Sequence, residues 1–183
     1  MATNETAALF DAANAPLTEI ITSVDASGWD APSPCTDWAA RDVIAHLIDT
    51  QRDFFARFEI DLGEAPSVDD PAAAWAAHVA AVRPHLDDDA FIAREYDGYF
   101  GPTTVGETLR IFYISDLISH RWDLARAVGG DDILTDTELD FLDASFDYYK
   151  DAAYSPGIYE APIDVPDDAD RQTKVLARMG RQA

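Results

Sequence analysis

The apolar residues of this chain recur at spacings of three and four, and this pattern limits the chain to a largely helical fold. An α-helix brings such positions onto one face, which must pack against another element. Stripes of this kind cover residues 5–26, about 37–61, 72–86 and 104–128, and the last one ends at the glycines 129 and 130. No segment repeats a strand pattern, so we expect an all-α bundle of four long helices.

The remaining segments predict additions to this bundle. Residues 87–101 mix aromatic residues with Gly98 and Gly101, which indicates a short extended excursion or hairpin. The capping-box pattern from Thr135 to Glu138 opens a further helix that runs to residue 149. Residues 155–170, with Pro156, Gly157, Pro162 and Pro166, predict a loop, and residues 173–179 predict an additional short C-terminal helix. The length of 183 residues fits one domain, which we expect to span residues 1–183.

The charge balance excludes several classes of function. The chain has 35 acidic and 13 basic residues, a formal net charge of −22, so it lacks the basic surface that nucleic acid requires. No apolar run approaches the roughly 20 residues that span a bilayer. Residues 1–5 do not resemble a secretory signal, and we therefore expect an acidic, cytoplasmic protein without a membrane partner. Its one cysteine excludes an internal disulfide and a four-cysteine zinc site.

Three residues on two of the apolar helices could together bind a metal ion. Asp116 and His120 are four positions apart, one turn along the same helix face. His46 lies midway along the helix predicted for residues 37–61, and it adds a third ligand if the two helices are neighbours. Two imidazoles and one carboxylate would leave a coordination position open, which is more typical of catalytic than of structural metal sites. The simpler alternative is a helix surface pair worth about 0.3 kcal/mol and a hydrogen-bonded core histidine.

Asp123 lies one turn beyond His120, and its role has two interpretations. It could accept the second ring N–H of a metal-binding His120 and so fix the tautomer of that imidazole. It could equally form a salt bridge with Arg126 or Arg41.

Other reactive residue types are better explained by packing or solvation. Cys35 precedes a helix, where a thiol can become nucleophilic, although a lone cysteine beside Pro and Trp is more often a small buried filler. His78 and His85 fall in an alanine-rich helix and are expected to have surface or packing roles. Trp122 is expected to pack, and the acidic runs at 87–89 and 167–168 are expected to be solvated.

Two internal blocks resemble a known family. Residues 34–38 and 41–47 read P-C-T-D-W and R-D-V-I-A-H-L, and residues 116–127 read D-L-I-S-H-R-W-D-L-A-R-A. Both are similar to the motifs of actinobacterial metal-binding proteins related to mycothiol-dependent maleylpyruvate isomerase, within the DinB/YfiT-like superfamily. The ending at residues 173–181 is similar to the leucine-rich G-R terminus of the same group.

The resemblance implies a four-helix bundle with up-down-down-up connectivity and a divalent metal ion between the helices. Carried over by position, the ligands are His46, Asp116 and His120; the isomerase has glutamate where this chain has Asp116. We expect the ion to be zinc, with nickel, iron or manganese as alternatives, because two histidines and a carboxylate suit several ions. The resulting hypothesis is a metal-dependent enzyme that resembles a thiol transferase or an isomerase. It would activate water or a low-molecular-weight thiol of the mycothiol or bacillithiol type. Its other partner would be an electrophilic substrate. The alternatives are a non-catalytic metal-binding or stress-response module, and a structural bundle that associates with a partner or with itself as a homodimer.

Overall fold

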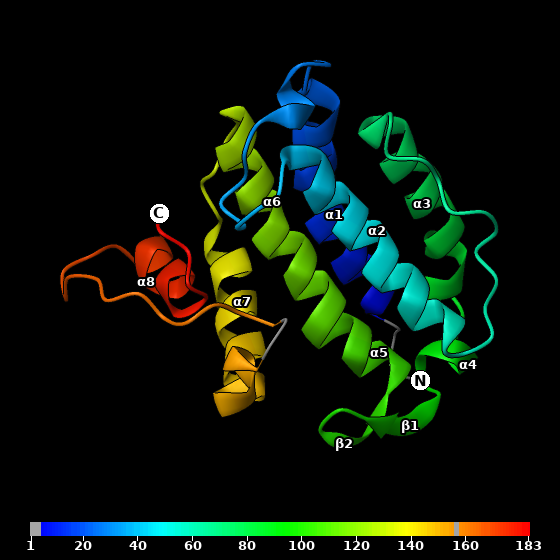
Figure 1. Cartoon of the computed structure of the whole chain (residues 1–183). Helices are drawn as coiled ribbons and strands as arrows, with labels where there is room; N and C mark the ends of the chain where they lie inside the picture. The colour runs from blue at the N-terminus through cyan, green and yellow to red at the C-terminus, as the bar shows by residue number, and fades with distance from the viewer. Residues whose placement is uncertain (1–4, 156–157) are drawn as a thin grey trace.

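The computed structural model describes residues 5–155 and 158–183 of the chain, and four long helices form its body (Figure 1). These helices are α1 (Thr6–Ser23), α2 (Ala40–Ala56), α3 (Pro71–Leu86) and α6 (Ser115–Val128). Contacts of α1 with α6, α6 with α2, α2 with α3 and α3 with α1 close a ring around the core. In Figure 1 α1 and α6 run upward while α2 and α3 run downward, so the connectivity is up-down-down-up. The fold is therefore the all-α, DinB-like four-helix bundle that the sequence predicts.

The apolar stripes meet in the centre of the bundle. Leu17 of α1, Leu47 of α2 and Leu117 of α6 are fully buried, and the large rings of Trp75 on α3 and Trp122 on α6 fill the space between them. Burying one such side chain contributes about 1.5–3 kcal/mol. The bundle is thus held mainly by these stripes, as their spacing predicts.

Helix α2 is shorter at both ends than its stripe predicts. The chain before it is extended, because Pro32 pairs with Ala39 in an antiparallel bridge. The carboxylate of Asp42 accepts a hydrogen bond from the Ala39 backbone N–H, so the helix begins at residue 40 rather than near residues 36 to 38. It ends at Ala56 rather than near residue 61, and the chain then turns through Glu59 at φ 61°. Residues 33–38 therefore form a loop in place of the first turn expected for this helix.

The predicted helix over residues 104–128 is present, but it changes helix type along its length. Short helix α5 (Val105–Thr108) leads into a π-helical segment, η2 (Leu109–Ile114), and then into α6. The Thr104 hydroxyl caps the start by accepting the Glu107 N–H, whereas the Glu107 carboxylate pairs with Arg110 instead of completing a capping box. π-Helical turns are frequent at functional sites, and this one ends at Ile114, two residues before Asp116.

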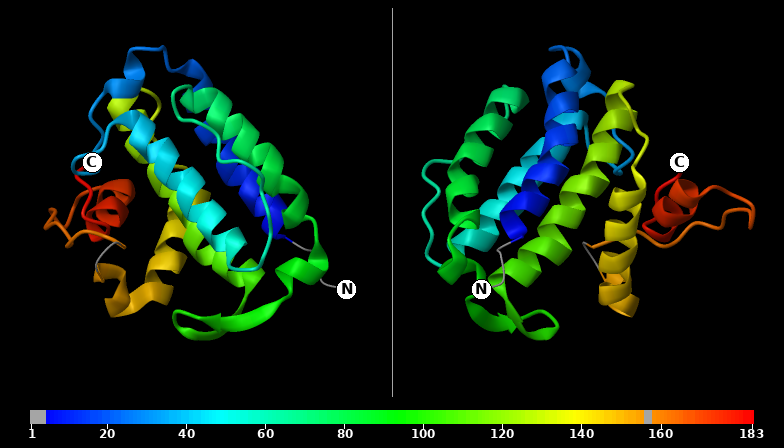
Figure 2. Two further views of the ribbon diagram at one scale, coloured as in Figure 1. Left: turned by 45° about the vertical axis from the view of Figure 1, so that its right-hand side comes forward. Right: turned by 180° about the vertical axis from the view of Figure 1, so that it is seen from behind.

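Smaller elements surround the bundle (Figure 2). A 3₁₀ turn η1 (Gly28–Asp30) follows α1, and α3 leads through α4 (Asp89–Ile92) into a two-stranded antiparallel hairpin, β1 (Glu95–Gly98) and β2 (Gly101–Thr104). This hairpin is the extended excursion that the sequence predicts. Among the described residues, no helix is long and apolar enough to cross a membrane.

Two further helices pack outside the bundle on the side of α6 (Figures 1 and 2). They are α7 (Asp136–Tyr149), which continues into the 3₁₀ turn η3 (Lys150–Tyr154), and α8 (Arg171–Arg178). Thr135 and Glu138 form the predicted capping box. The predicted loop at 155–170 forms no helix or strand where it is described; Pro156 and Gly157 of that prediction lie outside the described residues. Helix α8 agrees with the predicted C-terminal helix.

Candidate metal centre

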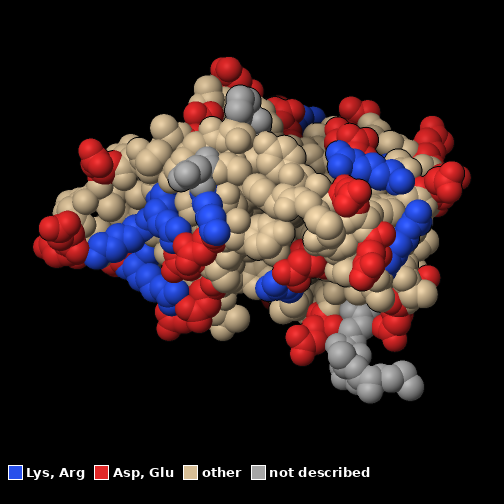
Figure 3. Space-filling model, turned by 90° about the horizontal axis from the view of Figure 1, so that it is seen from below, with Lys and Arg blue, Asp and Glu red and all other residues tan. Residues whose placement is uncertain are grey.

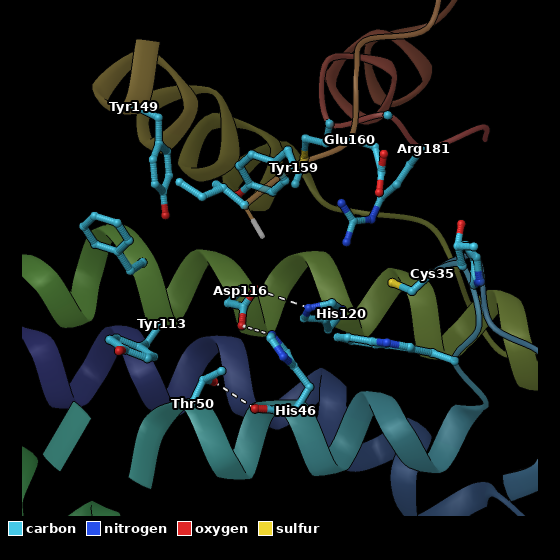
Figure 4. A pocket seen from close by; sticks show the side chains of 17 residues that line it. Cys35, His46, Thr50, Tyr113, Asp116, His120, Tyr149, Tyr159, Glu160 and Arg181 are labelled. Carbon is cyan, nitrogen blue, oxygen red and sulfur yellow. Dashed lines mark hydrogen bonds and ion pairs between the residues drawn. The ribbon is translucent and has the colours of Figure 1, made fainter. Parts of the chain in front are cut away.

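The three predicted metal ligands lie close together between α2 and α6 (Figure 4). His46 sits midway along α2, and Asp116 and His120 are one turn apart on α6. The Nε2 atom of His46 lies 3.2 Å from Oδ2 of Asp116, and the Nε2 atom of His120 lies 3.3 Å from Oδ1 of the same carboxylate. One atom from each residue fits within a group whose members all lie within 4.8 Å of one another. Two imidazoles thus face the two oxygens of one carboxylate.

The site fits a cation because Nε2 of a neutral His120 and the carboxylate of Asp116 are both hydrogen-bond acceptors and face each other. The Nδ1 atom of His120 donates a hydrogen bond to Asp123 over 2.8 Å, so a neutral His120 carries its proton on Nδ1 and a lone pair on Nε2. That lone pair would point at the Asp116 carboxylate, which also only accepts. The contact is favourable only if a positive charge lies there, either a proton on Nε2 or a metal ion.

Asp123 holds His120 from the opposite side of the ring. Its fully buried carboxylate accepts the His120 N–H, two N–H groups of Arg181 at 2.8 and 2.7 Å, and the thiol of Cys35 at 3.3 Å. The sequence suggested Arg126 and Arg41 as alternative partners, but Arg126 pairs with Asp132 and Arg41 with Asp30. Asp123 is therefore a fixed anchor for the His120 imidazole.

The charges of the cluster follow from these contacts. Burial alone would raise the pKa of Asp123, but the charge and hydrogen bonds of Arg181 outweigh it and hold that pKa below its usual range. Burial likewise opposes the charged form of Asp116, whose pKa is nevertheless lowered by His120 and His46. For His120 burial favours the neutral form, yet the charge of Asp116 raises its pKa well above the usual value. These charges favour a positive charge at Nε2 of His120, where either a proton or a metal ion can supply it.

A second group of potential ligands shares His120 with the first. Cys35, His120 and Asp123 also place one ligand atom each within 4.8 Å of one another. This group is the poorer cation site, because Asp123 already accepts two hydrogen bonds from Arg181 and one from His120. A metal ion there would compete with a buried guanidinium. Among the described residues, no arginine or lysine forms an ion pair with Asp116 in the group of His46, Asp116 and His120.

Trp38 covers both imidazoles. Its ring centroid lies 4.8 Å from that of His46 and 5.9 Å from that of His120, the latter in a stacked arrangement. Trp38 belongs to the loop before α2 that replaces the expected first turn of the helix. The packing limits the rotation of both rings and keeps their Nε2 atoms directed at Asp116.

A pocket of about 540 Å³ opens beside the three residues. One wall comes from segments distant in sequence from the bundle helices, including Tyr149 at the end of α7, Tyr159, Glu160 and Arg181 (Figure 4). Sequence reasoning assigned no function to these residues. The G-R ending at 180–181 was a visible pattern, but nothing in it indicated that Arg181 would reach Asp123.

The other expected residues lie apart from this centre. His78 is fully buried, and its Nε2 atom lies 3.1 Å from Oε1 of Gln51. Burial lowers the pKa of His78 to about 4, so it packs as a neutral residue. His85 packs near Phe55 and Phe91, and Trp122 is fully buried in the core.

Comparison with known proteins agrees with the geometry. The sequence profile of the family described as "Mycothiol maleylpyruvate isomerase N-terminal domain" matches residues 10–125, more than half of the chain. The chain belongs to this family. The matched segment contains α2 and α6 up to Ala125, and therefore His46, Asp116, His120 and Asp123. No curated protein and no solved structure matches the chain. Membership supports the DinB-like fold and a metal-binding, mycothiol-related character.

Proposed function

We propose that this protein is a cytoplasmic metal-dependent enzyme that activates a low-molecular-weight thiol, or water, for attack on an electrophilic substrate. The observation that carries the proposal is the convergence of His46, Asp116 and His120 on one point at the edge of a pocket of about 540 Å³. Pockets of about this size bind small molecules. A metal ion that only stabilised the fold would need no such space beside it.

The three residues would hold the ion through two imidazole nitrogens and the carboxylate of Asp116. Zinc is the proposed ion because this donor set, with further positions open, is typical of catalytic zinc sites. Nickel, iron and manganese accept the same donors. A bound divalent ion would supply Lewis acidity, which lowers the pKa of a thiol or a water molecule so that the nucleophile forms near neutral pH.

The residues around the site would prepare it for this chemistry. Asp123 keeps the proton of a neutral His120 on Nδ1 and leaves Nε2 free to bind a cation. Arg181 compensates the charge of Asp123, so the carboxylate remains ionised although it is fully buried. Trp38 shields both imidazoles on one side. Together these contacts hold the site in one geometry before a substrate binds.

The thiol is proposed from the family description, which names mycothiol. Bacillithiol has the same reactive group and is the natural comparison. The net charge of −22 argues against nucleic acid as a partner, so the proposed partners are the thiol and a small electrophile.

Metal analysis of protein purified without an affinity tag tests the first half of the proposal. We expect about one equivalent of a divalent metal in the wild type and a loss of most of it in His120→Ala. His85→Ala serves as the matched control, because His85 lies among aromatic rings outside the pocket lining. Equal metal content in wild type and His120→Ala would overturn the assignment.

Thiol consumption tests the second half. Metallated wild type is incubated with mycothiol and a panel of electrophiles, and the loss of free thiol is compared with that in the His120→Ala reaction. Faster loss in the wild type supports an enzyme. A fully metallated sample that consumes no thiol and hydrolyses no member of the panel would leave the non-catalytic metal-binding module as the better description.

A further inference from the structure

The pocket has two chemically different ends with the metal-binding cluster between them (Figure 4). Cys35 and Arg181 lie at one end, while Tyr113 and Tyr149 lie at the other. Aromatic rings line the second end and continue to Tyr159, which lies across the pocket from Asp116. We call these four residues the aromatic wall: Phe112, Tyr113, Tyr149 and Tyr159. The difference between the ends indicates that each receives a different chemical group.

The aromatic wall is a built surface rather than an accident of packing. Phe112 and Tyr149 meet edge to face with centroids 4.9 Å apart, and Tyr159 lies 5.8 Å from Tyr149. These rings come from the π-helical segment, from α7 and from the loop before α8. Tyr149 and Tyr159 lie beyond residue 125, where the family match ends. This part of the pocket is therefore a feature that family membership does not explain.

The aromatic surface continues outward to solvent. The ring centroid of Phe100, at the hairpin turn, lies 6.1 Å from the ring centroids of both Phe112 and Tyr149, and Phe100 is 40% exposed. Tyr99 and Tyr148 beside it are 73% and 38% exposed. Figure 3 views the molecule from the end that carries the hairpin, where uncharged side chains form a broad area bordered by charged ones. Exposed aromatic rings thus extend from the wall to the surface of the molecule.

The aromatic wall itself carries no charge. Burial keeps its tyrosines protonated and neutral, since it raises the pKa of Tyr159 to about 12 and those of Tyr113 and Tyr149 as well. The charged residues of the pocket lining, Asp116, Glu160 and Arg181, lie outside the wall. The wall therefore suits an uncharged ring, while any charged group of the same ligand would lie nearer to these residues.

We infer that the electrophilic substrate has an aromatic ring, and that this ring lies against the aromatic wall. The inference rests on the proposed function and specifies its substrate class. The ring places the reactive end of the substrate toward Asp116, His46 and His120. The polar end of the pocket, with Cys35 and Arg181, remains for the thiol.

Two uncharged ketones of similar size test the contribution of the ring. Acetophenone has an aromatic ring, and cyclohexyl methyl ketone has a saturated ring in its place. Binding of each to the zinc-loaded full chain is measured by ligand-observed NMR titration. We expect acetophenone to bind roughly threefold to tenfold more tightly, because one aromatic contact adds about 0.5–1.5 kcal/mol. Equal binding of the two ketones, or no binding of acetophenone, would overturn the inference.

Variants locate the ring and separate this inference from the proposed function. Phe112→Leu should weaken acetophenone binding roughly threefold to tenfold, while Phe141→Leu, a half-buried phenylalanine outside the pocket lining, should leave it unchanged. Equal effects of the two variants would contradict the assigned place. In Asp116→Ala a loss of zinc with retained acetophenone binding is expected. If the wild type binds no zinc but retains the ring preference, the metal proposal fails while the inference about the wall holds.

Discussion

Replacing Asp123 by Asn tests whether its ion pair with Arg181 stabilises the metal centre. The Asp123 side chain is fully buried, and that of Arg181 is 12% exposed. Asn has nearly the same shape but no charge, so the guanidinium loses its counter-ion and one of its two N–H acceptors. Removing one partner of a buried ion pair costs about 3–5 kcal/mol. We expect Asp123→Asn to lower the free energy of unfolding by about 3 kcal/mol.

Urea unfolding of metal-free protein, followed by tryptophan fluorescence, measures this loss without a contribution from metal binding. Asp30→Asn is the matched control, because Asp30 also binds an arginine, Arg41, but its side chain is 77% exposed. That substitution should cost less than about 1 kcal/mol. The double variant Asp123→Asn with Arg181→Gln should be more stable than the sum of the single changes implies. A loss from Asp123→Asn no larger than that from Asp30→Asn would refute the argument.

The same variant should also bind zinc less tightly. Asp123 orients His120, and loss of such a partner lowers metal affinity about 10–100-fold. Competition with a fluorescent zinc chelator measures the change. Unchanged affinity would show that the His120 imidazole is positioned without Asp123.

Three further predictions concern parts of the molecule away from the three ligands. Burial lowers the pKa of His78 to about 4, below its value of about 6.5 in the unfolded chain. As the pH drops between these two values, the unfolded chain binds a proton that the folded chain does not, so the free energy of unfolding falls. From pH 7 to pH 4 wild type should lose about 3 kcal/mol more than His78→Gln in urea unfolding, and parallel pH profiles would contradict this. Glu138→Gln removes the partner of buried Arg121, which joins α6 to α7, and should cost about 3 kcal/mol, whereas a loss below about 1 kcal/mol would show that the pair is dispensable. Gly180 has φ 75°, and a Cβ there would lie 2.5 Å from that of Glu160, so Gly180→Ala should lower the melting temperature; an unchanged value would contradict the close packing of this segment.

The sequence predicts the bundle well because helix periodicity is a local signal. Leu17 and Leu117 belong to two different apolar stripes, and each stripe predicts a helix with one buried face. Both residues are fully buried in the structure. The ends of α2 were predicted wrongly because they depend on a bridge between Pro32 and Ala39 and on the Asp42 cap, which involve residues outside the apolar pattern. The π-helical segment before Asp116 likewise leaves no mark in the apolar periodicity of the sequence.

The candidate site was predictable only in its helical part. Asp116 and His120 share a helix face by spacing alone, and His46 joins them because α2 and α6 pack side by side. Arg181 and Tyr159 reach the pocket through a chain path that crosses outside the bundle, and no local pattern encodes such a contact. The partners of Asp123 are therefore visible in the structure but could not be predicted from the sequence.

Zinc K-edge X-ray absorption of the zinc-loaded full chain tests the central claim most directly. Of the two overlapping ligand groups, only the one that includes Cys35 contains a sulfur atom. Coordination by His46, Asp116 and His120 predicts a first shell of nitrogen and oxygen only, with two imidazoles at about 2.0–2.1 Å. A sulfur neighbour at about 2.3 Å would place the ion at Cys35, and a shell without two imidazoles would contradict the account as a whole.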